Sequence, residues 1–554
     1  MSHDARDAGT DSAERTTGEA IVDGILSHGV DTVFGIPGVQ TYPLYDALAQ
    51  VPDRIKVYGP RHEQTAGYMA FGYAQATGHP GVFSVVPGPG ILNASAAMLT
   101  GYGASAPMVC LTSEVPTAFM GRGLGHLHEM PDQLATLRTF TKYAENIEQP
   151  MQAPALVSKA FACATSGRPR PVALAAPWDV LAARSRMTPY APASKSIDVP
   201  DTASIEAAAK LVVGVRNPLI LVGGGARHAS VEVSALAEFL QAPVVSFRGG
   251  RGVVSDEDVL GFTCAEGFER WADTEVVISI GCRMELAWMR WPDRPASLKT
   301  VVVDVDPQQF DRLSATVGVF GDAAVSAGLL LDALKADSKP APSRTDEFRA
   351  LKDRKRAEIF DFLQPHLGHL AAIRRALPRD GFFVEEICQV GFASYFGFPV
   401  YSPRTFITAG HQGTLGFGYP TALGVKAAFP DRAVVSITGD GGFMFGIQEL
   451  ATAVDYGLGV VCVVFNNRAY GNVLADQRRL FDGRSLGSEL RNPDFVKVAH
   501  AFGADGMQVH SPDELQRAVS AAIDANRPTV IEVEMPLDEQ RSAWRYLMPP
   551  ARLK

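Results

Sequence analysis

The sequence predicts an α/β protein made of three doubly wound domains, each built on a parallel sheet. Strand-length apolar runs alternate with helical patterns along nearly the whole chain, as expected for successive βαβ units. Several of these runs end in glycine-rich turns that open a helix, and this edge of a parallel sheet is where ligands bind. With 554 residues the chain is also too long for a single core, since domains usually hold roughly 100–200 residues.

The boundaries between domains follow shifts in composition along the chain. Six segments are expected in chain order: a disordered polar tail 1–15, a first domain 16–185, a central domain 200–337, a charged linker 338–365, a third domain 366–540 and a C-terminal tail 541–554. The central domain is preceded by a stretch that contains proline and serine, which is typical of a connection between domains.

The composition excludes several kinds of partner. The net charge is −9 and the basic residues form no stripe, which argues against a nucleic acid. The longest apolar stretches, such as Val460 to Phe465, have strand length and predict no membrane span. The six cysteines are scattered without metal-ligand spacing, and the first fifteen residues lack the apolar core of a secretory signal. We therefore expect a cytoplasmic protein with reduced cysteines.

The strongest functional signal lies in residues 439–471. An apolar strand pattern leads into the turn Gly439-Asp440-Gly441-Gly442, and a second apolar strand leads into Asn466-Asn467. A βαβ unit would bring Asp440 and Asn467 to one sheet edge, where their oxygens suit Mg²⁺ bound to a phosphate. The glycines would let backbone N–H groups approach that phosphate closely. The simpler alternative is a tight turn beside an asparagine-rich loop.

This pattern resembles the signature of thiamine-diphosphate-dependent enzymes, in which GDG is followed by an apolar run and a pair of asparagines. The resemblance implies that Mg²⁺ is bound by Asp440, by the side chain of Asn467 and by the backbone oxygen of Ala469. It also implies that Tyr470 and Gly471 lie against the diphosphate of the cofactor.

A second element lies far upstream, at Arg61-His62-Glu63-Gln64. A glutamate at the end of a strand is usually just solvated. Followed by a helix and by GVFSVVPGPGILNA, however, this element resembles the pyrimidine-binding domain of acetolactate-synthase-like enzymes. The resemblance implies that Glu63 bonds the aminopyrimidine and so promotes loss of the proton from thiazolium C2. It also places Pro37, Gly38 and Asn93 around the pyrimidine or the substrate.

A third element is HQGTLGFG, residues 411–418. From composition alone it is a glycine-rich helix entry, which is common in α/β folds. The resemblance implies instead that Leu415 props the cofactor into a bent shape and that the carbonyl of Gly413 accepts a hydrogen bond from its amino group. Such an arrangement would hold the base of the cofactor against its reacting carbon.

The residues that would select the substrate depart from the family pattern. His128 stands where acetolactate synthases usually have a glutamine, and it could polarise a substrate carbonyl or donate a proton. The alternative is an ordinary surface histidine. Val39 and Val86 stand where benzoylformate decarboxylase has a serine and a histidine, which weighs against that enzyme's chemistry with the same residues.

The central domain carries Gly223-Gly224-Gly225 after an apolar strand, where some relatives in the family hold FAD or an ADP group. Position 228 is a histidine, so the GxGxxG fingerprint of nucleotide binding is incomplete. FAD therefore stays open as a cofactor but is not favoured over a purely structural domain.

Together these features predict a thiamine-diphosphate- and Mg²⁺-dependent decarboxylase or carboligase that acts on a 2-oxo acid, with an aldehyde or ketone as acceptor in the second case. A thiamine-dependent C–C lyase or diketone hydrolase is the nearest alternative. An NAD- or FAD-binding oxidoreductase and a catalytically silent binding protein are more distant ones. Because in the family the first and third domains meet from different chains, the resemblance implies a homodimer or homotetramer with its active sites at the subunit interface.

Overall fold

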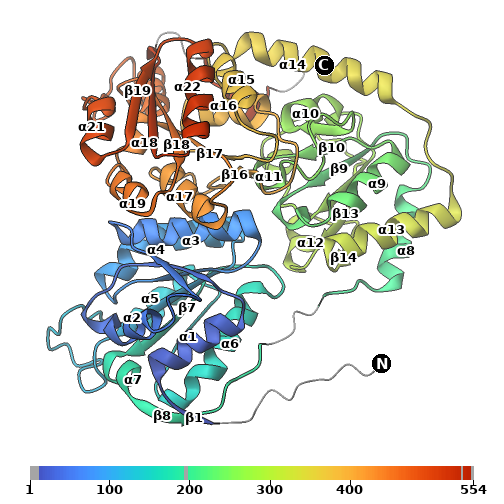
Figure 1. The fold of residues 1–554 in the computed structure, drawn as a ribbon. Coiled ribbons are helices and arrows are strands. Elements are labelled where there is room, and N and C mark those ends of the chain that lie inside the picture. The colour runs from blue at the N-terminus through green and yellow to red at the C-terminus, as the bar shows by residue number, and fades with distance from the viewer. Residues whose placement is uncertain (1–11, 193–196, 538–540, 551–554) are drawn as a thin grey trace. The chain divides into compact units, whose positions relative to one another are not determined.

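Three six-stranded parallel sheets form the framework of the computed structural model, which describes residues 12–192, 197–537 and 541–550 (Figure 1). The chain divides into two compact units, Met1–Ser196 and Ile197–Lys554. The first unit holds one of these sheets and the second holds two. The predicted α/β class with three parallel sheets is confirmed.

In the first unit the strand order is β3-β2-β4-β5-β7-β6. The strands are β2 (Thr32–Gly35), β3 (Lys56–Tyr58), β4 (Gly81–Ser84), β5 (Met108–Glu114), β6 (Tyr143–Asn146) and β7 (Val172–Pro177). The helices are α1 (Thr17–Ser27), η1 (Val39–Thr41), α2 (Tyr42–Ala49), α3 (Glu63–Thr77), α4 (Pro89–Ala104), α5 (Gln133–Phe140), η2 (Pro150–Gln152), α6 (Ala153–Thr165) and α7 (Trp178–Ala182). The chain leaves β2 and β4 in opposite directions along the sheet, so a switch point lies between them.

In the central sheet of the second unit the order is β11-β10-β9-β12-β13-β14. Its strands are β9 (Pro218–Val222), β10 (Val244–Ser246), β11 (Gly261–Thr263), β12 (Val276–Ile280), β13 (Lys299–Asp304) and β14 (Val317–Phe320). Its helices are α8 (Thr202–Val212), η3 (Gly224–Ala226), α9 (Ser230–Leu240), η4 (Arg248–Gly250), α10 (Cys264–Trp271), α11 (Glu285–Met289), α12 (Gln308–Arg312) and α13 (Ala323–Asp337). Here the switch point lies between β9 and β12.

The third sheet has the order β16-β15-β17-β18-β20-β19. Its strands are β15 (Phe382–Val384), β16 (Phe406–Ile407), β17 (Val434–Gly439), β18 (Val460–Asn466), β19 (Asp505–Val509) and β20 (Thr529–Glu534). Its helices are α15 (His366–Ala376), α16 (Gln389–Gly397), α17 (Gly418–Ala428), α18 (Asp440–Phe443), α19 (Glu449–Tyr456), α20 (Gly471–Leu480), α21 (Phe495–Phe502) and α22 (Pro512–Ala525). Helices cover both faces, which is why β18 is an unbroken apolar run, buried along its whole length.

The last positions of the expected polar tail, 1–15, belong to a strand. Strand β1 (Ala13–Thr16) pairs antiparallel with β8 (Arg184–Met187). Backbone hydrogen bonds between strands do not depend on apolar side chains, so the polar composition gave no sign of this ribbon. Residues 1–11 lie outside the described part.

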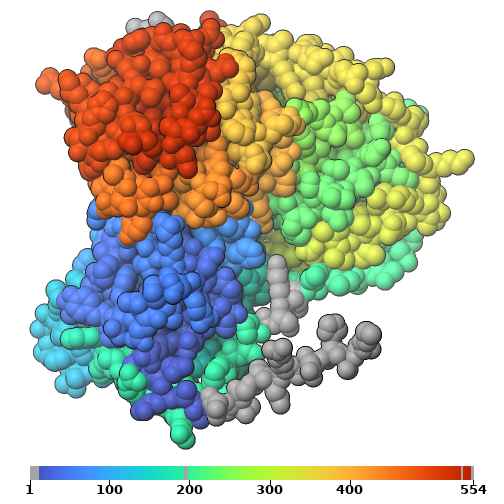
Figure 2. Space-filling view, in the orientation of Figure 1, coloured from blue at the N-terminus to red at the C-terminus, as the bar shows by residue number. Residues whose placement is uncertain are grey.

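The expected linker, 338–365, is largely the helix α14 (Thr345–Phe362), drawn in yellow in Figure 1. In the space-filling view, yellow atoms adjoin the green atoms of the central part (Figure 2). Its charge suggested an open connection, but Phe348, Leu351 and Ile359 are buried on one side of it. The expected C-terminal tail, 541–554, likewise contains a short helix, α23 (Trp544–Leu547), whose last two residues are buried. In the described ranges no helix combines the length and the hydropathy needed to cross a bilayer.

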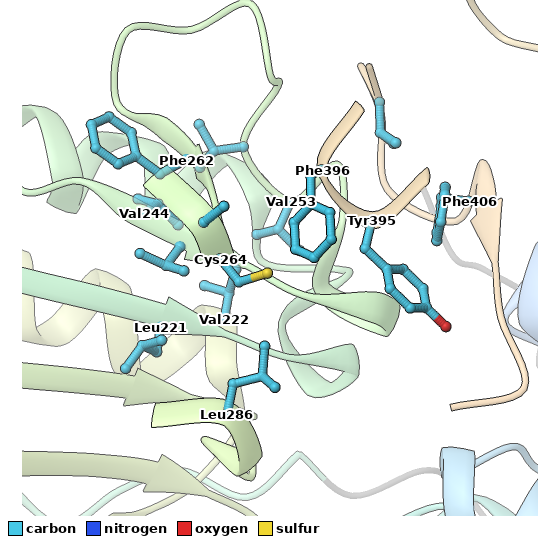
Figure 3. Close-up of a cluster of buried hydrophobic side chains, with 14 of the residues drawn as sticks. Leu221, Val222, Val244, Val253, Phe262, Cys264, Leu286, Tyr395, Phe396 and Phe406 are labelled. Atoms are coloured by element: carbon cyan, nitrogen blue, oxygen red, sulfur yellow. The ribbon is translucent and has the colours of Figure 1, made fainter. Parts of the chain in front are cut away.

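The central sheet and the third sheet share one apolar core. Figure 3 shows Tyr395 and Phe396, which belong to α16, beside Val253 and Cys264 of the central part. This continuous core explains why both sheets fall within one compact unit.

A buried ion pair lies at this junction. The Arg251 guanidinium contacts the Asp256 carboxylate and donates to the backbone carbonyls of Tyr395 and, at 2.9 Å, Phe398. The Asp256 carboxylate also accepts the N–H of Val400 at 2.7 Å. Both charged side chains are almost completely buried, so each depends on the other for compensation.

Helix α14 binds the other side of the same loop. The Lys352 ammonium donates to the backbone carbonyls of Asp256, Asp258 and Gly261, and burial lowers the pKa of Lys352 to about 8. Helix α14, which its charge suggested to be a linker, therefore holds the loop 256–261 of the central part.

We predict that Arg251→Met destabilises the second unit by about 3–5 kcal/mol, because it leaves the Asp256 carboxylate buried without its cation. The midpoint of urea unfolding measures this change. Arg379→Met is the matched control, since the ion pair of Arg379 with Glu257 is exposed and should contribute less than about 1 kcal/mol. Equal costs for the two substitutions would contradict the role given to the buried pair.

Candidate functional site

The third sheet opens a cavity of about 260 Å³ at the carboxyl ends of its strands. Strands β15 and β17 are hydrogen-bonded neighbours from which the chain departs in opposite directions, and such a switch point leaves a crevice. Ten residues singled out in the sequence line this cavity: Gly413, Leu415, Gly439, Asp440, Gly441, Gly442, Asn467, Ala469, Tyr470 and Gly471. The structure thus brings together three segments that are separate in the chain.

Asp440 begins α18 directly after β17, and only 2% of its surface is exposed. Burial is the main influence on its carboxyl group and raises the pKa of Asp440. The side chain of Asn492 donates to the carboxylate at 2.6 Å and also to the side-chain oxygen of Asn466 at 2.9 Å. Asn492 therefore links the ends of β17 and β18. The sequence analysis missed it, because it lies beyond the motif in a loop without a recognisable pattern.

The loop after β18 turns sharply. Arg468 adopts a left-handed backbone conformation, with φ of 56°, and its N–H donates to the side-chain oxygen of Asn466 at 3.1 Å. The N–H of Ala469 donates to the side-chain oxygen of Asn467, also at 3.1 Å. These turns, in which an asparagine binds the backbone two residues on, set the direction in which the chain enters α20. The loop is held from outside as well, since the N–H of Tyr470 donates to the carbonyl of Ser488 at 2.9 Å.

Two glycines allow the cavity wall to close. A Cβ atom at Gly441 would lie 2.5 Å from the ring of Tyr470, and one at Gly442 would lie 2.2 Å from a carboxylate oxygen of Glu386. Any side chain at these positions would push the cavity lining apart. The turn after β17 thus presents bare backbone to the cavity, as a phosphate-binding turn requires.

Glu386 is a residue next to the cavity that the sequence analysis did not identify. It is buried at the end of β15, and its carboxylate accepts the N–H groups of Gly416 at 2.6 Å and Gly418 at 3.0 Å. Burial raises the pKa of Glu386 to about 7, and those two hydrogen bonds oppose the shift. The carboxylate therefore fixes the loop that carries Gly413 and Leu415. The available signal was a pair of glutamates after a buried strand.

The remaining predicted residues lie in the first unit, at the carboxyl ends of β2, β3 and β4. Glu63 begins α3, and the side chain of Asn93 on α4 donates to its Oε2 at 3.0 Å. Pro37 and Gly38 follow β2, and a Cβ at Gly38 would lie 2.3 Å from the side chain of Val86. Glu63 and Asn93, which the sequence placed in separate motifs, are thus bonded to each other.

His128 lies on the loop that follows β5 and is half-buried. Its Nδ1 lies 2.9 Å from the side-chain oxygen of Gln40 in η1. The sequence analysis passed over Gln40, which is fully buried next to the Pro37-Gly38 turn.

The central sheet has a switch point of the same kind, but its glycines serve packing. A Cβ at Gly223 would lie 2.3 Å from the carbonyl oxygen of Gly281, and one at Gly225 would lie 2.8 Å from the Cα of Gly281. The turns after β9 and β12 are therefore in direct backbone contact. The side chain of Arg227 lies against the same region and donates to the carbonyl of Gly249 at 2.7 Å. These contacts account for the glycines without FAD.

Within the described ranges, no cluster of three or more His, Cys, Asp or Glu side chains could hold a metal ion. The set predicted for Mg²⁺ is of another kind, since it combines the Asp440 carboxylate with an amide and a backbone oxygen. Such an oxygen set suits Mg²⁺, which commonly takes one or two carboxylates and completes its shell with phosphate and water.

Comparisons with known proteins cover all three sheets and indicate one family. Models of thiamine pyrophosphate enzymes match the chain as an N-terminal TPP binding domain (15–136), a central domain (205–334) and a C-terminal TPP binding domain (387–533). The chain is 35% identical to a probable 2-ketoarginine decarboxylase of Pseudomonas aeruginosa over 94% of each protein. It is 33% identical to a probable acetolactate synthase large subunit of Methanocaldococcus jannaschii, over 93% of this chain and 91% of that one. It is 32% identical to the acetolactate synthase isozyme 3 large subunit of Escherichia coli, over 92% of each.

We predict that Glu386→Gln speeds amide hydrogen exchange in residues 413–418 by about tenfold or more. Glutamine keeps one acceptor oxygen, so one of the two N–H groups that Glu386 now accepts would face an amide NH₂ group instead. Exchange measured by mass spectrometry tests this without any ligand. Glu385→Gln is the matched control, because Glu385 accepts from the Tyr395 hydroxyl, which glutamine can still satisfy. Unchanged exchange in Glu386→Gln would show that the carboxylate does not hold the loop.

Proposed function

Since this chain belongs to the thiamine pyrophosphate enzyme family, we propose that it is a thiamine-diphosphate- and Mg²⁺-dependent decarboxylase or carboligase of a 2-oxo acid. The observation that carries the proposal is the cavity at the switch point of the third sheet, where Asp440 and Asn467 meet. The name of one relative, a 2-ketoarginine decarboxylase, supports the substrate class.

When bound, thiamine diphosphate supplies a nucleophilic carbon and an electron sink for the bond next to a carbonyl. Asp440, the side chain of Asn467 and the backbone oxygen of Ala469 would hold Mg²⁺. The bare backbone of Gly441 and Gly442 would face the diphosphate, with further contacts from the beginning of α20.

Glu63 would hold and move a proton on the aminopyrimidine side of the site. The side chain of Asn93 donates to Oε2 of Glu63, and Oε1 would face the cofactor ring. Leu415 and Gly413 would support the cofactor from the loop that Glu386 fixes. These roles follow the family pattern.

The alternatives have less support. A C–C lyase or diketone hydrolase matches none of the relatives named above. An oxidoreductase built on the Gly223 turn would need a nucleotide cradle, yet that turn is in backbone contact with Gly281. The proposal therefore includes no FAD. A decarboxylase would release an aldehyde and a carboligase a ketol, and both outcomes remain within the proposal.

We further propose that the enzyme is a homodimer or homotetramer whose sites combine Glu63 of one subunit with Asp440 of another. Helix α4 carries two large apolar residues, Leu92 and Leu99, that are 51% and 42% exposed. They are seven positions apart, so they lie on one face of the helix, next to Asn93. An apolar stripe beside a predicted cofactor ligand supports a partner subunit at this face.

The first test is a panel of 2-oxo acids, including pyruvate and 2-ketoarginine, supplied with thiamine diphosphate and Mg²⁺. We expect CO₂ release from at least one of them, with the product identified by mass spectrometry in the presence and absence of aldehyde acceptors. Glu63→Gln should lower the rate by at least about 100-fold, because an amide cannot exchange the proton. If no member of the panel releases CO₂ although calorimetry shows bound cofactor, the proposed function is wrong.

The second test mixes two inactive variants, Glu63→Gln and Asp440→Ala, under conditions of subunit exchange. One of the two sites in each mixed dimer would receive both intact residues, so random exchange should restore about a quarter of the wild-type activity. Mixing two differently tagged preparations of Glu63→Gln is the control and should restore none. Verified mixed dimers without activity, or a fully active monomer, would refute the shared site.

A further inference from the structure

The imidazole of His128 is tied to the first sheet by the amide of Gln40. Gln40 lies in η1 and is fully buried. Its Nε2 donates to the carbonyl oxygen of Leu127 at 2.8 Å, and its Oε1 lies 2.9 Å from His128 Nδ1. Both polar ends of one buried side chain are thus used to hold residues 127 and 128.

This network assigns the tautomer of His128. A carbonyl oxygen can only accept, so the NH₂ group of Gln40 must face Leu127 and its oxygen must face the ring. Nδ1 therefore carries a proton. Nε2 is the nitrogen left to take up or release one, and among the described residues the structure gives it no hydrogen-bond partner.

The backbone of His128 is held in a costly conformation. Its φ is 66°, in the left-handed region that residues with a Cβ rarely adopt. A Cβ at Gly88 would lie 2.6 Å from the His128 carbonyl oxygen, so the two backbones touch. Gln133, also buried, accepts the N–H of Gly88 at 2.9 Å and donates to the carbonyl of Ser113 at 2.8 Å. Such strain persists where the surroundings enforce it, often at functional sites.

The same end of α4 reaches Glu63. Gly88 is the residue before α4, and Asn93, which bonds Glu63, follows five residues later. At 1.5 Å per residue this separation is about 7.5 Å along the helix. The His128 backbone and the Glu63 carboxylate therefore meet one helix start, at the switch point between β2 and β4.

The charged groups near His128 on the same loop are already engaged. The Glu129 carboxylate accepts the N–H groups of Gly123, Gly125 and His126 at 2.8–3.0 Å. Asp132 caps α5 by accepting the N–H of Ala135 at 2.8 Å. Glu114, at the end of β5, is buried and its carboxylate accepts the N–H of Val115 at 3.0 Å. From η1 and from the residue before α4, His128 is contacted by the amide of Gln40 and by Gly88.

We propose that Gln40 is a positioning residue that locks His128 as the Nδ1–H tautomer, so that Nε2 delivers the proton consumed in the reaction. This inference rests on the proposed function. Decarboxylation of a 2-oxo acid converts R–CO–COO⁻ and H⁺ into R–CHO and CO₂. The carbon–carbon bond breaks, its electron pair ends in the new C–H bond, and no oxidant is needed. The imidazolium form of His128 donates its Nε2 proton, returns to the neutral Nδ1–H tautomer and takes up the next proton from the solvent.

The hydrogen-bonded pair of Gln40 and His128 is tested first on the protein without substrate or cofactor. Carbethoxylation by diethyl pyrocarbonate, followed by mass spectrometry over a range of pH, reports how each histidine titrates. In Gln40→Glu the acceptor becomes a carboxylate, so the midpoint for His128 should rise by roughly one unit or more. Gln40→Met removes the hydrogen bond to His128 Nδ1 at similar side-chain volume. Both ring nitrogens of His128 should then react, and doubly modified His128 should appear.

His28 is the internal control, because it lies in the same unit and its Nδ1 faces the carbonyl of Gly24, which Gln40 does not contact. A general loss of structure in this unit would change both histidines, whereas loss of the hydrogen bond between Gln40 and His128 should change His128 alone. An unchanged His128 in both folded variants would overturn the inference. Because this readout needs no turnover, its failure is distinct from failure of the proposed function.

The proton transfer is tested with the acid that the panel identifies. His128→Gln should lower kcat by about 100-fold or more while leaving Glu63 intact. The pH profile of kcat/KM in Gln40→Glu should shift upward by the same amount as the labelling midpoint of His128. A labelling shift without a shift in the rate profile would refute His128 as the proton carrier.

Discussion

The chemistry of this chain depends on a constraint of parallel sheets: two neighbouring strands whose chains depart in opposite directions leave an open edge between their carboxyl ends. The constraint recurs three times, at β2 and β4, at β9 and β12, and at β15 and β17. In the central sheet the edge is closed by direct contact of the Gly223 and Gly281 turns. In the other two sheets it is lined by polar residues. The same topology thus produces two candidate half-sites, one in the first sheet and one in the third, and a packing contact between two turns in the central sheet.

The two half-sites are held by different chemistry. The third sheet places two buried carboxylates, Glu386 and Asp440, at its edge, and backbone N–H groups and Asn492 compensate them. In the first sheet the amides of Gln40 and Gln133 bind the loops, beside the buried Glu114 carboxylate at the end of β5. Buried carboxylates suit a site meant for a cation, whereas amides can fix a loop without adding charge near groups that exchange protons.

Buried charges connect the central part of the second unit to its third sheet. Lys352 donates to carbonyls of the loop 256–261, whereas Arg251 pairs with Asp256 of that loop and donates to the carbonyls of Tyr395 and Phe398 at α16, next to the cavity. These contacts connect the cavity side of the third sheet to the central sheet, where the Gly223 and Gly281 turns close the corresponding edge.

Local periodicity in the sequence determined the three sheets, and spacing within one βαβ unit determined that Asp440 and Asn467 line one cavity. Both follow from rules that act over short stretches of chain: alternation gives the strands, and a crossover brings successive strand ends to the same edge. The family motifs added Glu63 and Asn93, whose bond the structure then supplied. Tertiary structure alone decided the partners that come from distant loops. Asn492 lies 52 residues from Asp440, Glu386 lies 30 residues from Gly416, and Gln40 lies 88 residues from His128. Their side chains meet only after separate loops have packed onto a finished sheet, and no local pattern in the chain encodes that meeting.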